Sequence, residues 1–300
     1  MPASTQNKPA LSRLRRSILS VPAANARALE KVPGLDSDGF IFDLEDSVAP
    51  EKKAEARDHL RVFFERQDVK GRETVIRINP LDTDWGHADM ELVIEASPDA
   101  VLIPKVERVA QIQEVADLLS EAGAPDDLAI WAMIETPRGV INAPTLAGVD
   151  ERLKCFVVGL NDLRKATGVL PQPDRAYLVP WLMQIVLAGR AYGIDVIDSV
   201  FNDFKDMAGF EAECAQGRAM GFSGKMLIHP NQIEAANAHF GPDPDAVREA
   251  EAIIAAFALP EAQSLNVINL DGKMVERLHL EEAHKLLDLA HIIAERKKTS

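Results

Sequence analysis

The 300-residue sequence has only two cysteines, and none of its apolar runs approaches the roughly 20 residues that a membrane-spanning helix needs. Cys155 and Cys214 are too few for a disulfide framework, so we expect a reducing, cytoplasmic environment. The first dozen residues lack the apolar core of a signal peptide. Positive charge is also scarce, because 33 basic against 47 acidic residues give a net charge of −14. This balance argues against nucleic acid or an anionic membrane as a partner.

Nucleotide-binding loops are missing too, since no Gly-x-Gly-x-x-Gly or Walker-type segment follows any apolar run. Their absence disfavours an open, doubly wound sheet. The chain instead repeats short apolar runs that begin at residues 16, 39, 73, 100, 129, 155, 194 and 224, and a helical pattern separates most neighbours. Eight such units in about 220 residues are typical of a TIM barrel. We therefore predict a (β/α)8 barrel over residues 13–240, preceded by a disordered or loosely attached tail at 1–12.

Residues 241–300 follow a different pattern and predict a C-terminal extension. A helix is expected over 245–257, and a final helix over 280–295. Between them, residues 266–275 predict a hairpin, because the Asp-Gly pair at 271–272 suits a type I′ turn. This extension cannot bury both its faces alone, so we expect it to pack on the barrel or on a neighbouring subunit.

Charged and polar side chains gather where the predicted strands end. In a barrel these ends surround one mouth, where catalysis is placed. The residues are Glu45, Asp46, Arg77, Asn79, Lys105, Glu135, Asp162, Asp198 and His229.

Glu135 and Asp162 are candidate ligands of a divalent metal ion. Each follows a short apolar run and precedes a turn signal, so both are expected at one edge of the sheet. Mg²⁺ typically takes one or two carboxylates and keeps waters that a substrate can displace. The alternative is that each residue caps a following helix and no metal binds.

Arg77 is a permanent cation whose planar fork suits an enolate or carboxylate oxygen. A salt bridge with Glu45 or Asp46 is the alternative, and the two roles are compatible. Asp43, Glu45 and Asp46 form a dense acidic patch that needs a cation or a raised pKa. We interpret Glu45 and Asp46 as supports for Arg77 and for metal-bound water.

Three basic features allow other chemistry. Lys105 is placed to form a Schiff base, as in metal-free aldolases, but the nearby Glu107 favours a protonated lysine in an ion pair. His229 suits acid–base catalysis or a structural hydrogen bond. The arginines within residues 13–16 suit either a solvated turn or a phosphate site at the mouth.

Several of these stretches, in the same order, resemble the citrate lyase beta-subunit-like branch of the HpcH/HpaI aldolase superfamily. The resemblance covers nearly the whole chain, and its motifs are specific to the superfamily but not to one substrate. The matching segments are residues 14–22, 42–48, 77–79, 104–107, 134–136, 159–163, 224–232 and 271–275.

The resemblance implies a Mg²⁺-dependent carbon–carbon lyase that cleaves a malyl-, citramalyl- or citryl-CoA type of 3-hydroxyacyl-CoA into acetyl-CoA and a 2-oxo acid. It makes Glu135 and Asp162 the metal ligands, with Arg77 beside the thioester enolate. The substrate- and CoA-binding residues it implies are Arg16, Arg77, Lys105, Glu135 and Asn161.

The resemblance also implies a homotrimer or hexamer whose C-terminal segment closes over a neighbour's site. Glu276 stands where the family usually has the aspartate proposed as acid/base, and residues 277–278 are Arg-Leu where Pro-His is common. The alternatives are malyl-CoA thioesterase or malate synthase-like activity, a CoA-independent class II hydroxy-oxo-acid aldolase, and a non-catalytic acyl-carrier-binding subunit of a lyase complex. The sequence leaves the acyl-CoA and the direction of reaction open.

Overall fold

The computed structural model describes residues 13–66, 69 and 71–299, so the predicted tail at 1–12 lies outside the described residues. The chain divides into two compact units, Arg15–Phe240 and a second unit made chiefly of Gly241–Ser300. Among the described residues, no helix combines the length and apolar character needed to cross a bilayer.

The first unit is a closed barrel of eight parallel strands, each hydrogen-bonded to the next and β8 to β1, which confirms the predicted fold. Its strands are β1 (Ser17–Pro22), β2 (Gly39–Asp43), β3 (Glu73–Arg77), β4 (Ala100–Ile103), β5 (Ala129–Ile134), β6 (Leu153–Val158), β7 (Asp195–Asp198) and β8 (Gly224–Leu227).

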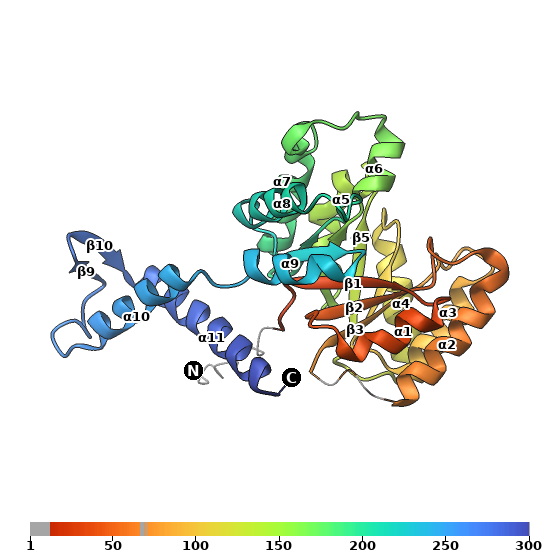
Figure 1. The fold of residues 1–300 in the computed structure, drawn as a ribbon, viewed down its shortest axis with the longest axis horizontal. Helices are drawn as coiled ribbons and strands as arrows, with labels where there is room; N and C mark the ends of the chain where they lie inside the picture. Colours follow the sequence, from red (N-terminus) through yellow and green to blue (C-terminus); the bar gives the residue numbers. More distant parts are fainter. Residues whose placement is uncertain (1–12, 67–68, 70, 300) are drawn as a thin grey trace, which may run out of the picture. The chain divides into compact units, whose positions relative to one another are not determined.

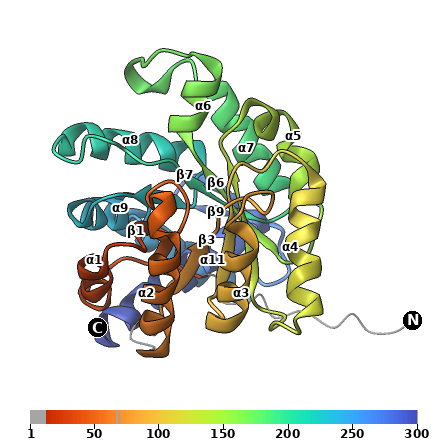
Figure 2. The ribbon, with the colours of Figure 1, turned by 90° about the vertical axis from the view of Figure 1, so that its right-hand side faces the viewer.

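Helices surround these strands (Figures 1 and 2). They are α1 (Ala26–Lys31), α2 (Lys53–Arg66), α3 (Gly86–Ala96), α4 (Val109–Glu121), α5 (Pro137–Ala147), α6 (Leu160–Thr167), α7 (Val179–Ala191), α8 (Met207–Met220) and α9 (Ile233–His239).

The strands are buried on both faces, as expected when helices cover a barrel from outside and side chains fill it from inside. One cluster of buried side chains fills the barrel interior and includes Val75, Trp131 and Met133. Successive strand residues point to opposite faces. Arg77 therefore shares the interior side of β3 with Val75, and Glu135 continues the interior row of Trp131 and Met133 just beyond β5.

Ion pairs close the amino end of the barrel. Arg15 donates two hydrogen bonds of 2.7 Å to Glu73 and one of 2.8 Å to Asp195, at the starts of β3 and β7. Arg16 makes a bidentate pair with Asp38, with both contacts at 2.8 Å.

These arginines precede β1, and in a parallel barrel all strand starts lie at the end opposite the mouth. The predicted phosphate site at the mouth is therefore wrong for the arginines at 15 and 16. The CoA-side role that the resemblance implies for Arg16 is contradicted for the same reason, since its guanidinium pairs with Asp38 at the far end of the barrel.

The second unit contains α10 (Pro244–Ala258), β9 (Val267–Leu270), β10 (Lys273–Glu276) and α11 (Arg277–Thr299). Asp271 and Gly272 have φ angles of 50° and 84°, which agrees with the predicted type I′ turn. The last helix begins at Arg277 rather than at residue 280, because the His279 ring accepts the Glu276 N–H at 2.9 Å and the chain passes directly from strand to helix. Packing of this unit on a neighbouring subunit stays a prediction.

Closure of the barrel is expected to depend on Gly224, the first residue of β8. A Cβ added there would lie 1.7 Å from the carbonyl oxygen of Arg15, a backbone atom that side-chain rotation cannot move away. We expect Gly224→Ala to lower the free energy of unfolding by about 3 kcal/mol, measured by urea denaturation. Gly34→Ala is the control, because nothing lies within 4 Å of the added atom. Equal stability of the two variants would contradict the prediction.

Candidate active site

The central contact at the mouth is an ion pair between Asp43 and Arg77, which end β2 and β3. The two residues lie opposite each other in the register of these strands. Arg77 Nε and Nη2 each donate a hydrogen bond of 2.6 Å to one carboxylate oxygen of Asp43. Burial disfavours the charged form of Asp43, but Arg77 together with the hydrogen bonds from Ser47 and Glu45 more than offsets burial and holds the pKa of Asp43 below its usual value. The pair therefore stays ionised and fixes the guanidinium plane.

The other nitrogen of the fork, Arg77 Nη1, is oriented by Glu45 and Met133. It lies 3.3 Å from Glu45 Oε2 and 3.5 Å from Met133 Sδ. The predicted salt bridge between Arg77 and Glu45 is confirmed. However, sequence reasoning missed Asp43 as the main partner of Arg77. The sequence did contain an indication of this pair, because β2 and β3 are neighbouring strands of five residues that end in Asp43 and Arg77.

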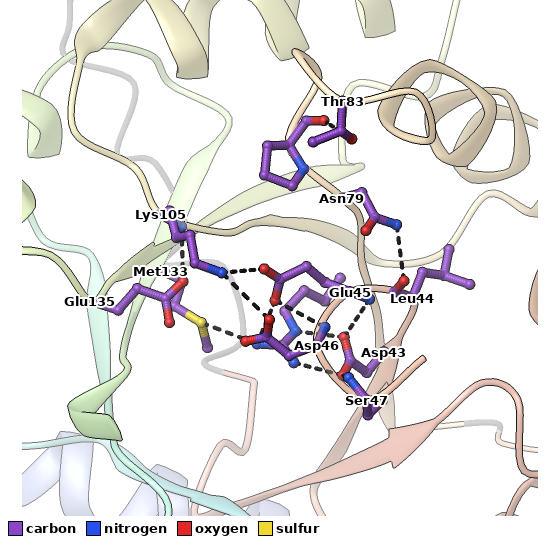
Figure 3. A network of polar contacts seen from close by, with 12 residues as sticks. Asp43, Leu44, Glu45, Asp46, Ser47, Asn79, Thr83, Lys105, Met133 and Glu135 are labelled. Atoms are coloured by element: carbon purple, nitrogen blue, oxygen red, sulfur yellow. Dashed lines mark hydrogen bonds and ion pairs between the residues drawn. The ribbon is translucent and has the colours of Figure 1, made fainter. Parts of the chain in front are cut away.

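Lys105 extends from the end of β4 toward the loop that follows β2, as Figure 3 shows. Its Nζ is hydrogen-bonded to Glu45 Oε1 and lies 3.6 Å from Asp46 Oδ1. Burial lowers the pKa of Lys105, but Glu45, helped by Glu135 and Asp46, more than offsets burial, so the pKa lies above its usual value. The predicted ion pair therefore exists with a different partner, since Glu107 instead faces Arg138 at 4.0 Å. A firmly protonated lysine disfavours Schiff-base chemistry.

Glu135 is a buried carboxylate at the mouth and is only 2% exposed. Its Oε1 accepts the backbone N–H of Lys105 at 2.9 Å, but in the described part of the chain no basic side-chain nitrogen lies within 4.0 Å of it. Burial raises the pKa of Glu135 to about 7, and the more distant charges of Arg77 and Lys105 oppose this rise only in part. Its charge is therefore poorly compensated by the protein alone.

Glu135 lies against the start of α6, the helix that carries Asp162 in its first turn and has Gly159 as its N-cap. A Cβ added to Gly159 would lie 2.4 Å from Glu135 Oε2, so the carboxylate rests against the glycine backbone. Asp162 is half-buried in the first turn of α6, beyond the end of β6. The helix-cap alternatives are wrong for both acids, because Thr136 caps α5 and Gly159 is the N-cap of α6.

This donor set fits a magnesium ion. No group of three or more His, Cys, Asp or Glu side chains among the described residues forms a metal cage. Glu135 and Asp162 follow the neighbouring strands β5 and β6 at the same end of the barrel, and Glu135 is buried without a cation among the described residues. Two carboxylates leave coordination positions for water and for an oxygen-rich substrate. Glu135 and Asp162 are therefore the residues that could hold Mg²⁺.

Asp198 and His229, which the sequence also predicts at the mouth, do not contact the group formed by Arg77, Lys105 and Glu135 and their partners. Asp198 is buried against Arg175 and Lys225, at 2.7 and 3.1 Å, on the opposite face of β7 from the interior residue Ile197. His229 stacks on a phenylalanine ring with centroids 4.6 Å apart, and its Nδ1 lies 2.7 Å from Asn231 Oδ1, which supports the structural hydrogen bond.

Asn161 and Glu276 are the remaining residues that the sequence predicts for the site. Asn161 is exposed and exchanges two amide hydrogen bonds with Asn202, at 2.8 and 3.2 Å, a partner that sequence reasoning missed. Glu276 ends β10 in the second unit, and its role in proton transfer stays a prediction.

The model of the HpcH/HpaI aldolase/citrate lyase family matches residues 16–230. The chain belongs to this family. The match spans the barrel and all the strand-end residues described above, and it ends before the second unit.

Members of the family that resemble the chain differ in the activity they are named for. A (3S)-malyl-CoA thioesterase from Cereibacter sphaeroides is 46% identical over 93% of this chain and 95% of its own length. The human mitochondrial citramalyl-CoA lyase is 30% identical over 94% and 87%. The CitE protein of Mycobacterium tuberculosis, solved with magnesium, acetoacetate and coenzyme A, has a TM-score of 0.74 and 28% identity over 92% and 97%. The family therefore supports chemistry on CoA esters without fixing the reaction.

The raised pKa of Glu135 predicts a pH-dependent stability of the metal-free protein. Because this pKa is about 7 in the folded chain against an ordinary 4.5, the folded state binds the proton more tightly than the unfolded state. The contribution of Glu135 to stability therefore falls as pH rises between these values. We expect Glu135→Gln to be more stable than wild type by about 3 kcal/mol near pH 8, and equally stable near pH 4.

Urea denaturation in EDTA measures this difference. Glu107→Gln, at a half-exposed glutamate after β4, is the matched control and is expected to follow the wild-type curve. A stability gain of the same size at both pH values would contradict the assignment.

The contact between Gly159 and Glu135 predicts an effect on metal binding. In Gly159→Ala the new Cβ displaces the Glu135 carboxylate, since its nearest atoms would lie at 2.4 and 2.6 Å. We expect the affinity for Mg²⁺ or Mn²⁺, measured by titration calorimetry, to fall at least about 10-fold, or 1.4 kcal/mol. Gly34→Ala is again the control, and unchanged affinity in Gly159→Ala would contradict the predicted metal position.

Proposed function

We propose that this protein is a Mg²⁺-dependent enzyme that cleaves a carbon–carbon bond in a malyl-CoA type of 3-hydroxyacyl-CoA, releasing acetyl-CoA and a 2-oxo acid. The observation that carries the proposal is the buried Glu135 carboxylate, which lacks an ion-pair partner among the described residues and feels the charges of Arg77 and Lys105 only from beyond 4.0 Å. Membership of the HpcH/HpaI aldolase/citrate lyase family and the magnesium in the CitE complex support it.

In this proposal Glu135 and Asp162 hold the ion through one carboxylate each. When bound, Mg²⁺ supplies Lewis-acid polarisation of the hydroxy acid and of the 2-oxo acid it becomes. The protein contributes the rest of the site: Gly159 and the backbone N–H of Lys105 fix the Glu135 carboxylate from two sides. Such fixed groups need little reorganisation during the reaction.

Arg77 is proposed to stabilise the charge that develops on the thioester oxygen. A base takes the hydroxyl proton, the hydroxyl carbon becomes a carbonyl, and the electrons of the broken bond pass to the enolate of acetyl-CoA. That enolate then takes a proton at carbon to give acetyl-CoA. Asp43 holds two nitrogens of the Arg77 fork, and the third nitrogen, Nη1, lies between Glu45 Oε2 and Met133 Sδ. Glu276 of a neighbouring subunit is the proposed acid/base.

Thioester hydrolysis is the second candidate, and the 46% identity to a (3S)-malyl-CoA thioesterase favours it. The same Arg77 would stabilise the oxyanion formed when water attacks the thioester carbonyl. The products would be free CoA and the hydroxy acid instead of acetyl-CoA and a 2-oxo acid.

We further propose a cytoplasmic homotrimer or hexamer in which the second unit reaches a neighbouring barrel. The exposed apolar side chains of Met274 and Leu278, on either side of Glu276 in the sequence, support this proposal because a partner surface would cover them.

Product analysis with Mg²⁺ tests the proposal. We expect turnover of malyl-, citramalyl- or citryl-CoA. We expect this activity to fall at least about 100-fold in Glu135→Ala and Asp162→Ala, because removing a metal ligand should cost more activity than removing a residue that only supports a ligand. Acetyl-CoA with a 2-oxo acid indicates the lyase, whereas free CoA with the hydroxy acid indicates the thioesterase. Glu107→Gln is the control. Full activity with excess EDTA, or no turnover of any of the three thioesters, would overturn the proposal.

A further inference from the structure

Lys53, at the start of α2, is a buried lysine with every donor in use. The residue is 5% exposed, and Nζ donates three hydrogen bonds of 2.8 Å to Leu44 O, Glu45 O and Asn79 Oδ1. An ammonium group has three protons, so its donors are saturated. The adjacent Lys52 differs completely, since its side chain is 52% exposed and pairs with Glu55 at the surface.

Two of these acceptors are backbone carbonyls of the segment 43–47, which we call the acidic loop. The same loop carries the carboxylates that orient Arg77 and Lys105. From the other side, the Asp43 carboxylate accepts the N–H groups of Glu45 and Ser47, at 2.9 and 3.0 Å. The loop backbone is therefore fixed both by its own aspartate and by the ammonium of Lys53.

A second set of contacts fixes the lysine itself. Asn79 donates to Leu44 O at 2.9 Å, as Figure 3 shows, and to Asp89 at 2.6 Å. Asp89 in turn pairs with Arg57 at 2.9 Å, and the Trp85 ring lies 5.2 Å from Lys53 Nζ. This network makes the position of Nζ depend on α2, β3 and α3 together.

Simple filling of the core does not account for this arrangement. A buried ammonium loses its hydration, and burial lowers the pKa of Lys53, although four facing carboxylates oppose that shift (Asp43, Asp89, Glu45 and Asp46). A hydrophobic side chain would fill the same volume at α2 without this desolvation cost. What an apolar residue could not do is tie two consecutive carbonyls of the acidic loop to Asn79.

We propose that Lys53 is a positioning residue, which fixes the acidic loop and through it the Arg77 and Lys105 cations. This inference rests on the proposed function, because it assigns those cations to the thioester side of the site. It predicts a separation of two properties. Glu135 is held by the Lys105 backbone and Gly159, not by the acidic loop, so metal binding should survive when Lys53 is lost.

The test compares Lys53→Met and Lys53→Arg with the matched control Lys52→Met in the full chain. We expect kcat to fall at least about 10-fold in both Lys53 variants, while Mn²⁺ affinity stays within about twofold of wild type. Lys53→Arg keeps the charge, which favours folding, but its planar fork cannot direct donors to three converging acceptors. The control should match wild type in both properties.

Two results would overturn the inference. One is a folded Lys53 variant with wild-type kcat, and the other is a loss of kcat that merely parallels a loss of Mn²⁺ affinity in both variants. Hydrogen exchange of the backbone amides at 43–48 gives a readout independent of activity, and we expect faster exchange in Lys53→Met or Lys53→Arg but not in Lys52→Met. Failure of the proposed function appears separately, as a wild-type protein without thioester turnover, and exchange then still decides whether Lys53 fixes the loop.

Discussion

The ion pair between Asp43 and Arg77 is the contact on which the mouth of this barrel depends. A buried charge pair is costly to desolvate, and good geometry with additional hydrogen bonds is needed to offset that cost. The register of β2 and β3 supplies the geometry, and the amides of Glu45 and Ser47 supply hydrogen bonds. Because this pair fixes the guanidinium plane, it also determines where Glu45, and in turn Lys105, can find a partner.

Acidic and basic side chains gather at both ends of the barrel interior, but they are paired differently at the two ends. At the amino end, Arg15 bridges Glu73 and Asp195, so positive charge contacts the acids of two strands directly. At the mouth, Arg77 and Lys105 contact Asp43 and Glu45, while Glu135 in the described structure has no basic nitrogen within 4.0 Å. Because this carboxylate is buried without a nearby positive charge, a cation bound beside it would lower the electrostatic free energy. The asymmetry distinguishes an end that seals the barrel from an end suited to bind a metal ion.

The sequence was sufficient for the fold. It also placed Arg77, Lys105 and Glu135 at strand ends of the mouth, but it did not reveal their pairing, and it placed Asp198 and Arg16 there as well. Eight apolar runs at regular spacing specify a barrel because strands buried on both faces must be apolar. Lys105 was assigned to Glu107 by proximity along the chain, whereas its partner Glu45 is 60 positions away and becomes a neighbour only when the barrel closes. The prediction for Arg16 was wrong because it overlooked the direction of the chain. Arg16 precedes β1, and residues that precede a strand lie at the amino end of the barrel, opposite the mouth. Nothing local in the sequence indicates that Gly159 must leave room for Glu135.

Carbon–carbon cleavage and thioester hydrolysis place charge on the same atom, which explains how one mouth can serve either proposed reaction. The enolate and the tetrahedral oxyanion both arise from the thioester carbonyl, so a donor fixed as Arg77 is by Asp43 suits both. The outcome must then depend on what faces the substrate from the other side: a group that exchanges protons with carbon, or a water that attacks the carbonyl. In the proposed assembly that group is Glu276, which is one methylene longer than the aspartate that the family resemblance leads us to expect there. Discrimination between the two reactions would therefore reside in the second unit, whereas the barrel supplies what they have in common.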